Sequence, residues 1–262
     1  MIRVELKKLY ENAPADVVHH FHSHSVSPPV GNIEELRAAR NVASRTRRIV
    51  YSLASFGEIL AKLMSEILNS SLTSQETVRL SRVDLDYLGW WEFPKIETVA
   101  RHIPEDLTEE KFLDRCKVLH QLVIEGFSES VIRKSIETLG FDKNKTKELR
   151  SLKLLSIFMA ICEESKESGL VLLDDTEDII NRISSGNKTY FMPTLFTLND
   201  LRVISAHRGD KSHSKKLNEA LEVLEIDIVS TTSGWGHVLD KIYDEIAQEI
   251  DKINSILQQV DI

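Results

Sequence analysis

The 262-residue sequence has only two cysteines, Cys116 and Cys162, with six prolines and ten glycines. Both cysteines lie in apolar helical patterns, so we expect core residues of an intracellular chain rather than a disulfide framework. Few prolines and glycines leave few breaks for long helices. No apolar run approaches the roughly 20 residues that cross a bilayer, and the start lacks a secretory signal, so we expect a cytoplasmic protein.

Basic residues are also in the minority, because Lys and Arg total 33 against 41 Asp and Glu, a net charge of −8. This excludes a protein coated in basic surface, so any nucleic-acid contact must come from a local patch. One candidate patch gathers five arginines, Arg37, Arg40, Arg45, Arg47 and Arg48. On a helix they would cover about half the circumference and could grip a phosphate backbone. The alternative is a solvated face paired with acidic neighbours.

Apolar residues recur at three- and four-residue spacing through most of the chain, which predicts an all-α helical bundle. We expect an N-terminal segment containing histidine and proline over residues 1–31, followed by a single helical unit over residues 32–262. An N-cap at Asn32 would begin one long helix. We expect residues 70–107 to form an irregular insertion, with a short extended piece over residues 78–85.

Helix signals are clearest in the second half of the chain. Thr108 should cap a helix that runs to about Glu125, and Pro193 suits the first turn of a helix that ends near His207. The last helix has an apolar seam that needs a partner helix, either within the fold or from a second copy. This seam consists of Leu239, Ile242, Ile246, Ile250, Ile253, Leu257 and Val260.

Arg202 and His207 lie five positions apart in the stretch TLNDLRVISAHRG. A histidine titrates near neutrality and can take the proton from a ribose 2′-hydroxyl. An arginine stays charged and can stabilise the phosphate as that oxygen attacks it, so no metal or other cofactor is needed. The spacing alone is a weak signal. It recurs in Arg115/His120, on a helix flank, and in Arg208/His213, in a polar turn.

The stretches LNDLRVISAHRG and SGWGHVLDKIYDEI resemble the C-terminal part of bacterial HEPN-superfamily domains. The resemblance covers residues 145–258. It implies a small helical bundle that acts as a metal-independent endoribonuclease in a bacterial toxin or antiphage defence system. It also implies that Arg202 and His207 are the catalytic pair. A homodimer or a complex with a partner protein would form through helical surfaces that include the C-terminal helix.

The sequence departs from the HEPN pattern at Val203, where a polar residue usually follows the motif arginine. Asn199 and Asp200 could supply the missing polar group and orient the catalytic pair. Some members of the superfamily are binding modules without nuclease activity. A non-catalytic interaction or nucleic-acid-binding module therefore stays open as the alternative function.

Two further hypotheses, DNA binding and metal binding, depend on other stretches of the sequence. Residues 108–140 have the outline of a helix-turn-helix DNA-binding regulator, but the second helix offers only Arg133 and Lys134 as cations. Alternate histidines on an extended segment could share a metal ion, although a loop is the simpler interpretation. The histidines concerned are His19, His20, His22 and His24.

Overall fold

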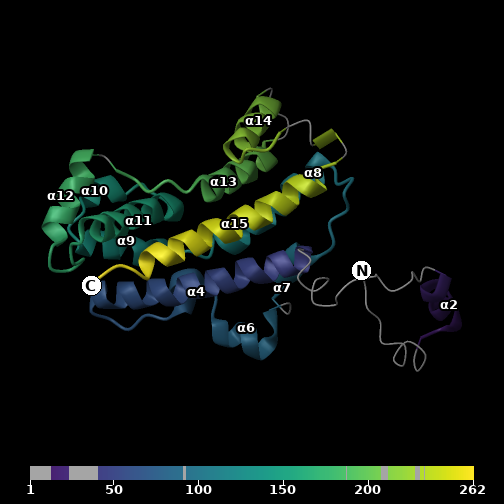
Figure 1. Ribbon diagram of the computed structural model, residues 1–262, viewed down its shortest axis with the longest axis horizontal. Coiled ribbons are helices and arrows are strands. Elements are labelled where there is room, and N and C mark those ends of the chain that lie inside the picture. The colour runs from purple at the N-terminus through teal and green to yellow at the C-terminus, as the bar shows by residue number, and fades with distance from the viewer. Residues whose placement is uncertain are drawn as a thin grey trace. The chain divides into compact units, whose positions relative to one another are not determined.

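The computed structural model describes residues 13–23, 41–90, 93–186, 188–207, 212–227, 231–232 and 234–262. Within these residues it contains thirteen helices and no strand, so the predicted all-α class is confirmed (Figure 1). The chain divides into two compact units, residues 1–39 and residues 40–262. The first unit contains α2 (Ala15–Ser23). None of the described helices is long and apolar enough to cross a membrane.

Two long helices, α4 (Val42–Leu68) and α15 (Gly236–Leu257), lie side by side in the second unit (Figure 1). The predicted seam of the terminal helix is buried from Leu239 to Leu257, and α4 is the helix that covers most of it. Val260 lies beyond the end of α15 and is partly buried. Its partner therefore lies within the fold. Burying such a stripe removes several aliphatic side chains from water, each contributing roughly 1.5–3 kcal/mol.

Ion pairs fix how α4 and α15 align. Arg45 lies 2.9 Å from an oxygen of Asp240 and 3.2 Å from one of Asp244, and its side chain is only 14% exposed. Further along both helices, Arg48 lies 2.8 Å from Asp251. The order of these pairs shows that the two helices run in the same direction. An axial slip would separate the charges, so the pairs select one register.

The start of α4 differs from the prediction. Asn41 has an extended backbone (ψ 164°), and its side chain accepts a hydrogen bond from the Ser44 N–H at 2.8 Å. This side-chain cap begins the helix at Val42. One continuous helix from Asn32 is therefore wrong, and Asn32 itself lies outside the described residues.

The region predicted as an irregular insertion contains three short helices, α5 (Ser74–Val78), α6 (Arg82–Leu88) and α7 (Pro94–Ala100). The extended piece predicted over residues 78–85 is wrong, because its ends lie in α5 and α6. Thr73 and Ser81 cap these helices by accepting hydrogen bonds from the N–H groups of Glu76 and Asp84. Local capping therefore outweighs the preference of Val78 and Val83 for strands.

The other helices are α8 (Glu109–Val123), α9 (Glu129–Thr138), α10 (Lys143–Thr146), α11 (Ser151–Ser168), α12 (Thr176–Gly186), α13 (Pro193–Ala206) and α14 (His213–Val223). Thr108 caps α8 by accepting a hydrogen bond from the Lys111 N–H, and Pro193 is the first residue of α13. Both predicted helix starts are thus confirmed. α13 packs against α8, α14 and α15, so it connects most of the second unit.

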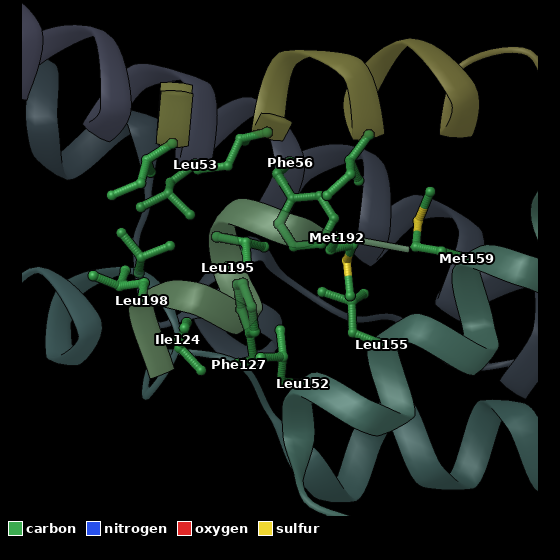
Figure 2. Packing of buried hydrophobic residues seen from close by; sticks show 14 of the residues in the cluster. Leu53, Phe56, Ile124, Phe127, Leu152, Leu155, Met159, Met192, Leu195 and Leu198 are labelled. Atoms are coloured by element: carbon green, nitrogen blue, oxygen red, sulfur yellow. The ribbon is translucent and has the colours of Figure 1, made fainter. Parts of the chain in front are cut away.

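The first turns of α13 enter the middle of the core (Figure 2). Figure 2 shows Met192, Leu195 and Leu198 facing Leu53 and Phe56 of α4 and the apolar side of α11. The two cysteines belong to the same core. Cys116 and Cys162 are both 0% exposed, which confirms the predicted core role, and burial raises the pKa of each thiol.

Residues 234–236, at the start of α15, hold the loop before α8. The Trp235 N–H donates to the Leu107 carbonyl at 2.9 Å, and the Gly236 N–H donates to the Glu105 carbonyl at 3.2 Å. Gly234 has a φ of +128°, and a Cβ there would lie 2.1 Å from the Glu105 oxygen. Glycine is therefore required at this position by both conformation and space.

Replacing Gly234 with alanine should lower the free energy of unfolding by about 2 kcal/mol or more, because the methyl group meets backbone atoms. Gly140→Ala is the matched control. Gly140 also has a positive φ, +86°, but nothing lies within 4 Å of a Cβ there. Its cost should stay near 1 kcal/mol. Urea unfolding followed by circular dichroism compares the two, and equal losses would contradict the close approach.

Candidate functional site

Arg202 and His207 lie at the C-terminal end of α13. Arg202 is in the penultimate turn, and His207 is the C-cap residue, whose N–H donates to the Ile204 carbonyl at 3.1 Å. Both side chains are exposed, so solvent and a substrate can reach them. Five residues correspond to about 140° of net rotation around a helix. In one copy of the chain the two side chains therefore meet different neighbours.

On one side of the helix end, His207 borders a small hollow, which we call the basic hollow. It is lined by Val203, Ile204, His207, His213 and Lys216. Nε2 of His213 lies 2.8 Å from a carboxylate oxygen of Glu109, at the start of α8. Two imidazoles and an ammonium thus face one small space in an otherwise acidic protein. The Lys216 ammonium could bind an anion such as phosphate at the rim, and the Glu109 carboxylate beside His213 opposes this.

On the other side of the helix end, Asn199 and Arg202 lie one turn apart and face α8. Both side chains lie close enough to His120 of α8 to affect its pKa, which Asn199 raises and the Arg202 guanidinium lowers. His120 is only 6% exposed. Its Nδ1 lies 3.5 Å from an oxygen of Glu125 but makes no hydrogen bond of good geometry. We call these four residues the His120 cluster.

Burial lowers the pKa of His120, Arg202 lowers it further, and Glu125 opposes both effects. The imidazole is therefore neutral near pH 7, and the charge beside Asn199 is that of Arg202. Asp200 is next in the chain to Asn199. Surrounding protein atoms raise the pKa of its carboxyl, and a hydrogen bond from Asn199 opposes that shift.

Sequence reasoning missed His120, because the Arg115/His120 pair was explained as a helix flank. Arg115 turns away from the cluster and donates to the Val99 carbonyl at 2.7 Å. A signal for His120 did exist in the sequence. It falls on the apolar stripe of α8, beside Leu119 and one turn before Val123, and a histidine at a core position needs a polar partner.

The arginines of the N-terminal patch have different surroundings. Arg45 and Arg48 pair with acidic residues of α15, as described above, and the Arg47 guanidinium lies 5.3 Å from the ring centre of Tyr51. Arg37 and Arg40 lie outside the described residues. For Arg45 and Arg48, this is the arrangement expected of a face paired with acidic neighbours.

The structure also describes residues of the two further hypotheses, the helix-turn-helix regulator and the histidine metal site. Arg133 donates to the Thr146 and Leu149 carbonyls and lies 2.6 Å from Glu129. Its neighbour Lys134 is exposed. Of the clustered histidines, His19 and His20 are exposed on α2, whereas His24 and the side chain of His22 lie outside the described residues. The described parts of the chain contain no group of three or more side chains placed to hold a metal ion.

Arg45→Ala should lower the free energy of unfolding by about 1–3 kcal/mol, because it leaves two partly buried carboxylates without their cation. Arg48→Ala is the control. Its ion pair is more than two-fifths exposed on both sides, so its loss should cost well under 1 kcal/mol. Chemical denaturation measures both variants. If Arg45→Ala is as stable as Arg48→Ala, the alignment role of Arg45 is refuted.

His120→Gln should flatten the dependence of stability on pH between about pH 5 and pH 7. The pKa of His120 lies below 6.5 in the folded chain, so the unfolded chain binds more protons in this range. The wild-type free energy of unfolding should therefore fall as the pH drops through about 6.5. Glutamine can still hydrogen-bond Asn199 but does not titrate. Urea titrations at several pH values test this, and parallel profiles for the two proteins would count against it.

The end of α13 thus has two polar surroundings, the basic hollow at His207 and the His120 cluster at Arg202. Both are built from helices that the fold packs together, α8 with α13 and α13 with α14. No protein-family model matches this chain, and comparison with curated proteins and with solved structures finds no match either.

Proposed function

We propose that this chain is an HEPN-like protein that binds and cleaves RNA without a metal ion, as a homodimer. The observation that carries the proposal is the exposure of Arg202 and His207 at one helix end, where His213 and Lys216 add further basic groups. A bacterial toxin or antiphage defence system is the setting that the resemblance implies.

In the proposed reaction, His207 takes the proton from a ribose 2′-hydroxyl, and the freed oxygen attacks the adjacent phosphorus. The bond to the 5′-oxygen breaks, which leaves a 2′,3′-cyclic phosphate and a 5′-hydroxyl. Arg202 stabilises the negative charge on the phosphate oxygens during the attack. Lys216 binds a neighbouring phosphate, and water returns a proton to the 5′-oxygen.

Asn199 has a supporting role, because it contacts His120 on the same helix face as Arg202. The His120 imidazole is neutral, so it does not add a second positive charge beside Arg202. Asp200 would act at the edge of the same face. The packing of α13 against α8, α14 and α15 gives the proposed catalytic arginine the rigid support that an active site requires.

A second copy would compensate for the rotation of about 140° around the helix that separates Arg202 from His207. Val203, between them in sequence, is 39% exposed and lines the basic hollow. An exposed aliphatic residue at this place suits contact with the same helix end of another copy. Two such ends would place each arginine beside the other copy's histidine, with a single RNA strand between them.

A non-catalytic interaction module is the second candidate, and one observation favours it. Within one copy Arg202 lies near the buried His120, which is not one of the motif residues. In this case the helix end would bind a partner or RNA without cleaving it. The two candidates differ in whether RNA is cut.

Arg202→Ala and His207→Ala should each slow RNA cleavage by about 100-fold or more, the usual contribution of such groups. The assay incubates mixed single-stranded RNA with the purified chain in EDTA and separates the fragments by electrophoresis. Arg101→Ala and His237→Ala are matched controls, because both side chains are exposed and lie outside the two clusters. RNA left intact by the wild type, or cut equally by all variants, would favour the interaction module.

A further inference from the structure

A second hollow lies at the opposite end of α13, against α15, and the proposed cleavage does not use it. Its volume is about 400 Å³, within the range of roughly 300–1,000 Å³ typical of small-molecule sites. The residues that matter for its chemistry are Tyr190, Phe191, Glu245, Gln248, Glu249 and Lys252. The fourteen residues of α13 separate it from His207, a distance of about 21 Å along the helix.

Phe191 presents an aromatic ring to this hollow. It is 70% exposed, although its neighbours Tyr190 and Met192 are 5% and 0% exposed. The segment is anchored to α11, since the Tyr190 N–H donates to the Ser156 carbonyl and the Ser156 hydroxyl donates to the Tyr190 carbonyl. Buried residues on either side therefore hold the ring outward on a fixed backbone. Exposed aromatic rings on rigid segments are the usual stacking platforms for unpaired bases.

Two carboxylates lie one turn apart on α15, and they differ in what they bind. Glu249 accepts hydrogen bonds from the Thr194 and Leu195 N–H groups at 3.1 and 2.8 Å, so it caps α13. Burial raises the pKa of Glu249, and these hydrogen bonds oppose that shift. Glu245, by contrast, has no hydrogen bond or ion pair with another residue in the part of the chain that the structure describes. Both of its oxygens remain available as acceptors.

The chemistry of these groups selects among the bases. A carboxylate accepts two hydrogen bonds side by side, and guanine alone presents two adjacent donors on its Watson–Crick edge, N1–H and the 2-amino group. Adenine, cytosine and uracil each pair one donor with an acceptor there. The ammonium group of Lys252 or the amide of Gln248 can donate to the guanine O6.

We propose that this hollow is a subsite for a guanine base of single-stranded RNA. Phe191 stacks on the base, Glu245 accepts from its two donors, and Lys252 binds its O6 or the adjoining phosphate. The subsite deepens the proposed RNA function and depends on it for the identity of the natural ligand. An RNA strand that follows α13 from this subsite would reach the basic hollow several nucleotides away, so cleavage would occur at a set distance from a guanine.

Binding of 5′-GMP, 5′-AMP, 5′-CMP and 5′-UMP to the whole chain, measured by isothermal titration calorimetry, tests the base preference. We expect a Kd for GMP at least tenfold lower than for the other three. Phe191→Ala and Glu245→Gln should each raise the Kd for GMP tenfold or more. Phe191 is exposed and Glu245 is half-buried, and circular dichroism checks that each variant keeps the fold. Equal affinity for all four nucleotides, or unchanged binding in both variants, would overturn the proposal.

Two controls and a second ligand sharpen the test. Tyr87→Ala and Glu222→Gln change an exposed aromatic residue and an exposed carboxylate elsewhere and should leave the Kd for GMP unchanged. The pentanucleotides UUGUU and UUAUU distinguish a base within a strand from a free nucleotide. Tighter binding of UUGUU supports the strand, and binding of GMP without it overturns the RNA subsite. Because no cleavage is measured, loss of the guanine preference and loss of nuclease activity remain separate results.

Discussion

The burial of the α15 stripe against α4 is the interaction on which the rest of the second unit depends. Both helices are long, and they run in the same direction, so their apolar sides can match over many turns. Hydrophobic burial is not directional and would tolerate a slip between them. The ion pairs of Arg45 with Asp240 and Asp244 are directional, so they select one register. An acidic protein thus uses its most concentrated basic segment to align its core.

α13 inherits its position from this pair. At its start, Met192 and Leu195 are buried between α4 and α11 (Figure 2). Glu249 of α15 accepts hydrogen bonds from two N–H groups of its first turn. The start of the helix is therefore fixed, and at its end Leu201 and Ile204 are buried while Arg202 and His207 are exposed. Polar side chains such as Arg202 and His207 can lie at that end without a desolvation penalty. The same geometry leaves the residues of both proposed sites exposed at the two ends of one helix.

The two stretches that carry the HEPN-like resemblance, one around Arg202 and one around Gly234, differ in whether packing explains them. The SGWG stretch is explained by packing, because Gly234 and Gly236 allow the backbone near Glu105 to approach closely. The stretch around Arg202 has no such explanation, since the arginine and His207 are exposed and stabilise little. Exposed charged and titratable residues on a rigid helix end are candidates for function rather than for folding.

Local signals in the sequence determined the helical class, the cap at Thr108 and the first residue of α13, because these features depend on hydrogen bonds within a few residues. Periodicity also identified the buried face of α15, but it could not name α4 as its cover. Only the tertiary structure brought His120 to Arg202 and Phe191 to Glu245. Each pair joins residues more than 50 positions apart, and their meeting depends on how helices pack, which no local pattern encodes.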